Sequence, residues 1–92
     1  MTYEVHITCD QKDRKSVEHV ATEYPWWKTS EIARDIVLGE KTYMYLTSHF
    51  RSKTDAFSRL GEAVDLLKRQ DCHVVREKIE LIVYDTKGPK TL

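Results

Sequence analysis

The chain has 92 residues, of which 40% are hydrophobic and 33% are charged. A chain of this length forms one domain that buries a single core without help from metals or disulfides. Its 15 Lys and Arg residues balance its 15 Asp and Glu residues, so the net charge is near zero. This balance argues against a protein that mainly binds nucleic acid or acidic membranes indiscriminately, although it leaves room for a local basic patch.

The cellular setting follows from hydropathy and cysteine content. No apolar run approaches the roughly 20 residues that a helix needs to cross a bilayer, and Met1 leads directly into a strand-like pattern. We therefore expect a cytoplasmic protein with no membrane partner. Cys9 and Cys72 show no CxxC or Cys/His zinc spacing, so we expect reduced thiols, no metal and no cofactor.

The first part of the chain predicts a strand followed by a helix. Residues 2–9 alternate between apolar and polar types, which is typical of a half-buried strand. Apolar residues recur at helical spacing over residues 12–24, and either Asp10 or Asp13 can cap this helix. Pro25 ends the helix, because the residue before a proline is pushed out of helical dihedrals.

Two further strands are predicted next in the chain. Residues 26–33 form a short edge strand, which begins with Trp26 and Trp27 as either an exposed recognition patch or part of the core. A loop over residues 35–40 leads to residues 41–51, the clearest strand pattern in the sequence. On that strand Met44, Leu46 and Phe50 oppose Tyr43, Tyr45, Thr47 and His49.

The last part of the chain predicts a helix, a strand and a tail. Ser52 caps the helix, and Gly61 inside it indicates a close contact with the sheet. Residues 74–84 form the last strand, in which a late start or a bulge leaves the facing of Arg76 open. Residues 87–92 are expected to be a flexible tail. The apolar stripe of the helix consists of Phe57, Leu60, Val64 and Leu67.

The order β-α-β-β-α-β predicts an α+β, ferredoxin-like sandwich over residues 1–86. Its four-stranded antiparallel sheet has both helices on one face, with the first and third strands at the centre. The fourth strand then lies beside the first, and the second beside the third. We call the other, uncovered side of the sheet the open face. Its expected residues are Glu4, His6, Thr8, Tyr43, Tyr45, Thr47, His49, Lys78, Glu80, Ile82, Tyr84 and, depending on the bulge, Arg76.

The open face predicts a binding surface for an anionic ligand or partner. Imidazoles, hydroxyls and an ammonium group hold phosphate or carboxylate groups, and a tyrosine ring can stack on a base or sugar. A nucleotide or a single-stranded nucleic acid would satisfy both. The residues expected to bind it are His6, Thr8, Tyr45, Thr47, His49 and Lys78.

Two short patterns resemble known families. His6-Ile7-Thr8 is similar to the His-x-Thr motif of the 2H phosphoesterases, which implies a phosphoesterase-like activity, although that family needs two such motifs and this chain has one. Tyr43 and Tyr45 resemble the stacking aromatics of RNA-recognition domains, but the glycine that accompanies them there is missing.

Three other interpretations of the same residues stay open. The open face could be a homodimer interface centred on aromatic and aliphatic side chains. His6 and His49 could instead form an acid–base catalytic site. Both could also be ordinary solvated histidines, because the strand register that would bring them together is not fixed by the sequence. The residues of the dimer interpretation are Tyr43, Tyr45, Ile82 and Tyr84.

Overall fold

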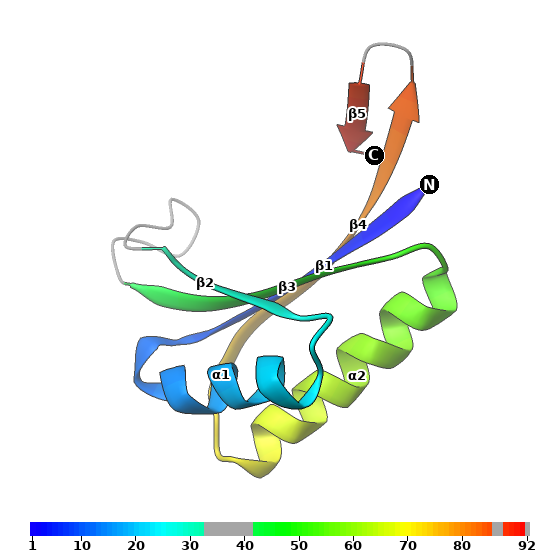
Figure 1. Cartoon of the computed structure of the whole chain (residues 1–92). Helices are drawn as coiled ribbons and strands as arrows, with labels where there is room; N and C mark the ends of the chain where they lie inside the picture. Colours follow the sequence, from blue (N-terminus) through cyan, green and yellow to red (C-terminus); the bar gives the residue numbers. More distant parts are fainter. Residues whose placement is uncertain (33–41, 86–87, 92) are drawn as a thin grey trace.

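The computed structural model describes residues 1–32, 42–85 and 88–91 of the chain. Its strands form one antiparallel sheet in the order β2-β3-β1-β4-β5, and both helices lie against the same face of that sheet (Figure 1). The α+β class predicted from the sequence is therefore confirmed. The elements are β1 (Thr2–Asp10), α1 (Arg14–Glu23), β2 (Lys28–Ile32), β3 (Tyr43–Phe50), α2 (Lys53–Arg69), β4 (Val74–Asp85) and β5 (Gly88–Thr91).

Short-range hydrogen bonds begin the helices. Asp10 accepts a hydrogen bond of 3.2 Å from the backbone N–H two residues on and caps a 3₁₀ turn, Gln11–Asp13, that leads into α1. Ser52 accepts one of 2.9 Å from the N–H three residues on, which confirms it as the N-cap of α2. Asp13 has another role: its carboxylate accepts a hydrogen bond of 2.9 Å from the N–H of His73, just before β4.

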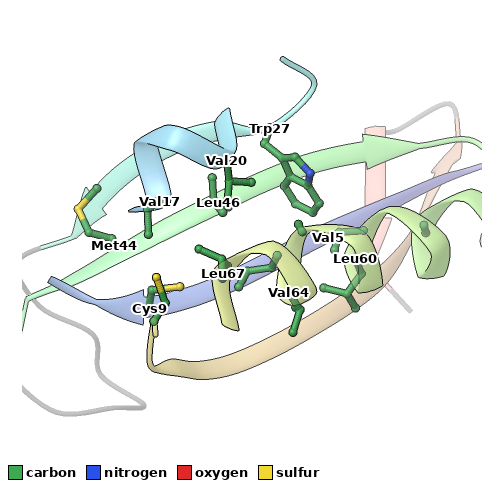
Figure 2. Close-up of a cluster of buried hydrophobic side chains, with 14 residues drawn as sticks. Val5, Cys9, Val17, Val20, Trp27, Met44, Leu46, Leu60, Val64 and Leu67 are labelled. Atoms are coloured by element: carbon green, nitrogen blue, oxygen red, sulfur yellow. The ribbon is translucent and has the colours of Figure 1, made fainter. Parts of the chain in front are cut away.

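The core fills the space between the sheet and the two helices (Figure 2). The apolar sides of the central strands provide its floor, and Val5, Ile7 and Leu46 are completely buried there. Burying one such side chain stabilises the fold by about 1.5–3 kcal/mol. The largest buried side chains are Trp27, Ile7, Leu46, Leu67, Val5, Val17, Val20 and Cys9.

The two adjacent tryptophans divide between the core and the surface. Trp27 is only 2% exposed and meets Phe50 edge-on, with 6.2 Å between ring centroids. Trp26 is 39% exposed, stacks on Tyr24 and lies under the guanidinium of Arg59, 4.6 Å from the ring centroid. Only Trp27 therefore belongs to the core.

Two expectations for α2 were wrong. Phe57 is 56% exposed, because the centre of the buried stripe lies about 75° away from it around the helix axis. Gly61 is exposed, and a Cβ added to it would meet nothing within 4 Å, so no close contact with the sheet explains this glycine. The buried stripe consists of Ala56, Leu60, Ala63, Val64 and Leu67.

Regular alternation along β4 places Arg76 on the open face. The register between β1 and β4 shifts only beyond Arg76, between Thr8 and Cys9. Before that shift Arg76 pairs with Thr8 and so lies on the open face, whereas Glu77 pairs with Ile7. Glu77 is exposed in spite of this helix-side position. A register irregularity is therefore present in β4, but it lies between Val74 and Arg76 and does not move Glu77 from the helix side.

The C-terminal residues extend the sheet. Within residues 87–92, which were expected to form a flexible tail, β5 pairs antiparallel with the end of β4 (Figure 1). Among the described residues, β5 therefore covers the edge of the sheet along residues 82–85 of β4, and the earlier part of β4 remains the edge strand. In the part of the chain that the structure describes, neither helix is long and apolar enough to cross a membrane.

The buried stripe of α2 can be tested by comparing two truncations on that helix. We expect Leu67→Ala to lower the free energy of unfolding by about 2–5 kcal/mol, because Leu67 is completely buried. Phe57→Ala on the exposed side should cost less than about 1 kcal/mol. Urea denaturation followed by circular dichroism measures both, and equal losses would contradict the assignment of the stripe.

Candidate functional site

The register of the sheet arranges the open face in cross-strand rows. Because β1 is paired on both sides, each polar residue of β1 has one neighbour on β3 and one on β4. Directly paired residues point to the same side of the sheet, about 5 Å apart. The rows are His49–Glu4–Glu80, then Thr47–His6–Lys78, then Tyr45–Thr8–Arg76, and β2 adds Lys28 beside Thr47 and Ser30 beside Tyr45.

The carboxylate of Glu4 joins the two histidines of the open face. His49 Nε2 lies 2.8 Å from Glu4 Oε2, and His6 Nε2 contacts Glu4 Oε1. The second ring nitrogen of His6, Nδ1, is 3.1 Å from Thr47 Oγ1. The network thus runs from Thr47 through His6 and Glu4 to His49, across two strands. Thr47, His6 and His49 were predicted as site residues. Glu4, which was not predicted as one, joins them into a single network.

The histidines keep Glu4 ionised. Burial by itself raises the pKa of this carboxyl group. The hydrogen bonds from His49 and His6, together with the electrostatic attraction of both rings, lower it by more than burial raises it, so the net pKa lies below its ordinary value of 4.5. Glu4 is therefore a carboxylate at neutral pH. It accepts hydrogen bonds and offers none, so it orients the two imidazoles.

Three cationic side chains lie around this network on the open face. Lys78, beside His6, places its Nζ 2.5 Å from Glu80 Oε1. Lys28 pairs with Thr47 and Arg76 pairs with Thr8, and both are exposed. The open face is therefore basic along the His6 and Thr8 rows and acidic along the Glu4 row.

Two of the predicted ligand-binding residues are covered. Thr8 is 3% exposed and Tyr45 is 9% exposed, although both lie on the side of the sheet away from the helices. Tyr43, next along the same side of β3, is 8% exposed. The Tyr45 ring thus has little free surface for stacking on a base, whereas His6, Thr47, His49 and Lys78 keep accessible surface.

Some sequence predictions fall outside the described part of the molecule. The loop expected over residues 35–40 and the side chain of Tyr84 are not described. Ile82, the remaining member of the apolar group proposed for a dimer, is half-buried.

The two cysteines lie in the core, away from the open face. Both are free thiols and both are buried (Figure 2 labels Cys9). Burial raises the pKa of Cys9 to about 12, and it also raises that of Cys72. A thiol that stays protonated is a poor nucleophile, so neither cysteine is prepared for chemistry.

Sequence reasoning did not place Lys28 on the open face, and it gave Glu4 and Glu80 no role in the site. The two glutamates matter most. The alternation placed both glutamates on the open face, but a carboxylate repels an anion and so was not expected to bind an anionic ligand. Their importance comes from the register, because Glu4 contacts both histidines and pairs with Glu80. No local spacing between residues 4 and 80 could have shown this.

Comparison with known proteins does not assign the site. None of the protein-family models matches the chain, and none of the curated proteins matches it either. The function is therefore argued from the geometry of the open face.

The Glu4 network can be tested through the pH dependence of stability. Because Glu4 has a lowered pKa in the folded protein, its stabilising effect is present above about pH 4.5 and is lost as the pH falls through the folded-state value. Glu4→Gln should therefore lower the unfolding free energy by about 1–2 kcal/mol at pH 7. The difference from the original protein should shrink towards pH 3.

The matched control is Glu18→Gln, which changes an exposed carboxylate on α1. It should leave the unfolding free energy within about 0.5 kcal/mol at every pH. Urea titrations between pH 3 and pH 7 measure both variants. A Glu4→Gln effect that does not vary with pH would contradict the role given to the carboxylate.

Proposed function

We propose that the protein is a small binding domain of ferredoxin-like architecture whose open face takes a phosphate-bearing ligand, such as a nucleotide or a short single strand. A cytoplasmic setting, expected from the sequence, is part of this proposal. Of the residues named from the sequence, His6, Thr47, His49 and Lys78 would bind the ligand, with Lys28 and Arg76 added. Thr8 and Tyr45, which were named with them, are buried and would support this surface from below.

One observation carries the proposal: two neighbouring rows of the open face contain hydrogen-bond donors and cations but no carboxylate. The first row consists of Lys28, Thr47, His6 and Lys78, and the second of Ser30, Tyr45, Thr8 and Arg76. Each row crosses four strands, so its ends are about 14 Å apart at roughly 4.8 Å per strand. Cations at both ends of such a surface attract an extended anion.

The partly buried character of the surface adds to this support. His6 has a side-chain exposure of 27%, and Lys78 one of 39%. Charged and hydrogen-bonding groups in such positions are less screened by solvent than those on a fully exposed surface. Because the whole chain has no net charge, it has little general attraction for anions. Binding should therefore depend on how well a ligand fits this local basic patch.

The His6–Glu4–His49 arrangement favours acid–base catalysis as a second candidate function. A carboxylate that orients an imidazole is a common part of such sites, and here one carboxylate contacts two imidazoles. This arrangement would support the phosphoesterase-like activity implied by His6-Ile7-Thr8. The dimer interpretation draws less support, because Tyr43 and Tyr45 are already buried within one chain.

Ligand binding can be tested by nuclear magnetic resonance titration with inorganic phosphate, adenosine monophosphate and a short oligouridine. We expect shift changes along β1, β3 and β4, and weaker binding as salt is added. Lys28→Ala and Arg76→Ala should each weaken binding by about 3- to 10-fold through the loss of one positive charge.

The control for these variants is Lys68→Ala, which removes an exposed positive charge from α2, on the covered side of the sheet. It should leave binding unchanged. The proposal fails if the three probes leave the open face unshifted, or if His6→Ala and His49→Ala bind every probe as the original chain does.

The catalytic candidate has a separate test. Hydrolysis of cyclic phosphates should show a bell-shaped pH–rate profile, and His6→Ala and His49→Ala should each lower the rate by about 100-fold or more. The absence of turnover, or a profile that is flat with pH, would remove it.

A further inference from the structure

Three metal-ligating side chains come together on the acidic row of the open face and the position next to it. One carboxylate oxygen each of Glu4 and Glu80 and a ring nitrogen of His6 all lie within 4.8 Å of one another. Two of these residues come from β1, and Glu80 lies directly opposite Glu4 on β4. Their side-chain exposures are 25%, 27% and 24% for Glu4, His6 and Glu80, so the group is half-buried.

The pairing of Glu4 with Glu80 is unfavourable for an antiparallel sheet. Two like charges directly opposite each other on the same face repel and destabilise the strands. Partial compensation comes from the histidines at Glu4 and from Lys78 at Glu80. Two carboxylates that are kept opposite each other by such partners form a ready acidic pair on the open face.

The hydrogen bond at the far side of His6 fits metal binding. Metal-ligating histidines nearly always use their second ring nitrogen to hydrogen-bond a neighbour, which fixes the orientation of the ring. Here His6 Nδ1 lies 3.1 Å from Thr47 Oγ1 while Nε2 is directed at Glu4. In the structure Nε2–H donates to the Glu4 carboxylate, so metal binding requires the His6 hydrogen to move to Nδ1. Because a hydroxyl both donates and accepts, Thr47 Oγ1 can then accept a hydrogen bond from Nδ1–H, and the lone pair of Nε2 faces the metal.

A similar outer contact holds the carboxylate of Glu4. One of its oxygens, Oε2, accepts the hydrogen bond from His49, while Oε1 faces His6. Hydrogen bonds of this kind orient the ligating carboxylates of metal sites. Thr47 and His49 therefore supply the outer support for an inner group made of Glu4, His6 and Glu80.

We propose that Glu4, His6 and Glu80 form a binding site for a divalent transition-metal cation. One imidazole and two carboxylates suit Zn²⁺, Mn²⁺, Fe²⁺ or Co²⁺, whereas Ca²⁺ and Mg²⁺ prefer oxygen ligands alone. The sequence predicted no metal because Glu80 lies 76 residues after Glu4 and 74 after His6, so the ligands form no compact motif. The inference stands on these contacts and is independent of the phosphate-binding proposal.

The dimensions agree with such a cation. Ligand bonds to these metals are about 2.0–2.2 Å long, so two ligand atoms on opposite sides of the ion are about 4.2 Å apart. The three ligand atoms lie within 4.8 Å of one another, so the most distant ones need only a small approach, while His6 Nε2 and Glu4 Oε1, which are in contact, must move apart to admit the ion. Three protein ligands leave further coordination positions, which face the solvent side of the sheet and can hold water or the oxygen of an anion.

Lys78 acts as a competitor for the same site. Its ammonium is paired with Glu80 in the structure, so a metal must displace it or share the carboxylate. The Lys78 ammonium and the metal ion would also repel each other at short range. Removing the lysine charge should therefore strengthen metal binding while it weakens the binding of a phosphate-bearing ligand.

The test is a titration of the whole chain with Zn²⁺ followed by isothermal calorimetry, and with Co²⁺ followed by visible absorption. We expect one equivalent to bind, with nuclear magnetic resonance shifts of the His6 ring and of the amides around Glu4 and Glu80. Glu80→Gln should weaken binding by 10-fold or more. Glu77→Gln, which changes an exposed carboxylate on the other side of the same strand, should leave it unchanged.

Two more variants separate this proposal from other outcomes. Thr47→Val removes only the outer contact to His6 and should weaken binding by about 10-fold. Lys78→Met should strengthen Zn²⁺ binding several-fold, a gain that a damaged fold cannot produce. The proposal is overturned if Zn²⁺ binds without shifting His6, if Glu80→Gln and Glu77→Gln behave alike, or if Lys78→Met weakens metal binding.

These results also keep the two proposals distinguishable. Phosphate binding that fails while Zn²⁺ binds at Glu4, His6 and Glu80 overturns only the proposed function. Zn²⁺ binding that fails while the phosphate titration shifts the His6 and Thr8 rows overturns only the metal site.

Discussion

The structure depends on β1 being paired along both of its sides. A strand in this position must bury its apolar face under the helices, and Val5, Ile7 and Cys9 are completely buried there. The period of two then fixes the opposite direction for Glu4 and His6. A slip of one residue would exchange the two sets, so the stability of the core also determines which side chains reach the open face.

The chemistry of the open face follows from how charges are distributed among the rows. Glu4 sits between two histidines and opposite Glu80, and the basic groups lie one and two rows further along β1. An anion and a metal ion can therefore use neighbouring parts of one surface without competing for the same ligands, except at His6 and Lys78. In a domain without net charge, this local separation of positive from negative groups is what can give selectivity.

Most of the fold could be predicted because it rests on local patterns. Alternation, helical spacing and Ser52 were sufficient for the predicted strands and both helices, since each pattern spans only a few residues. The prediction of the buried side of α2 was less accurate. Phe57 has the helical spacing of the buried residues of α2, but it lies beside their stripe and is exposed. The burial of Thr8 and Tyr45 was likewise not predicted, because the alternation along a strand gives the side of the sheet on which a residue lies but not how far its neighbours cover it.

By itself, the sequence determined the α+β class, the two sides of each central strand and the polar residues that the central strands place on the open face. Only the tertiary structure decided which of these residues touch. His6 and His49 meet through Glu4, and Glu80 lies opposite Glu4, because of a register set by the packing of the core. Strand register is a long-range property, and no spacing along the chain encodes it.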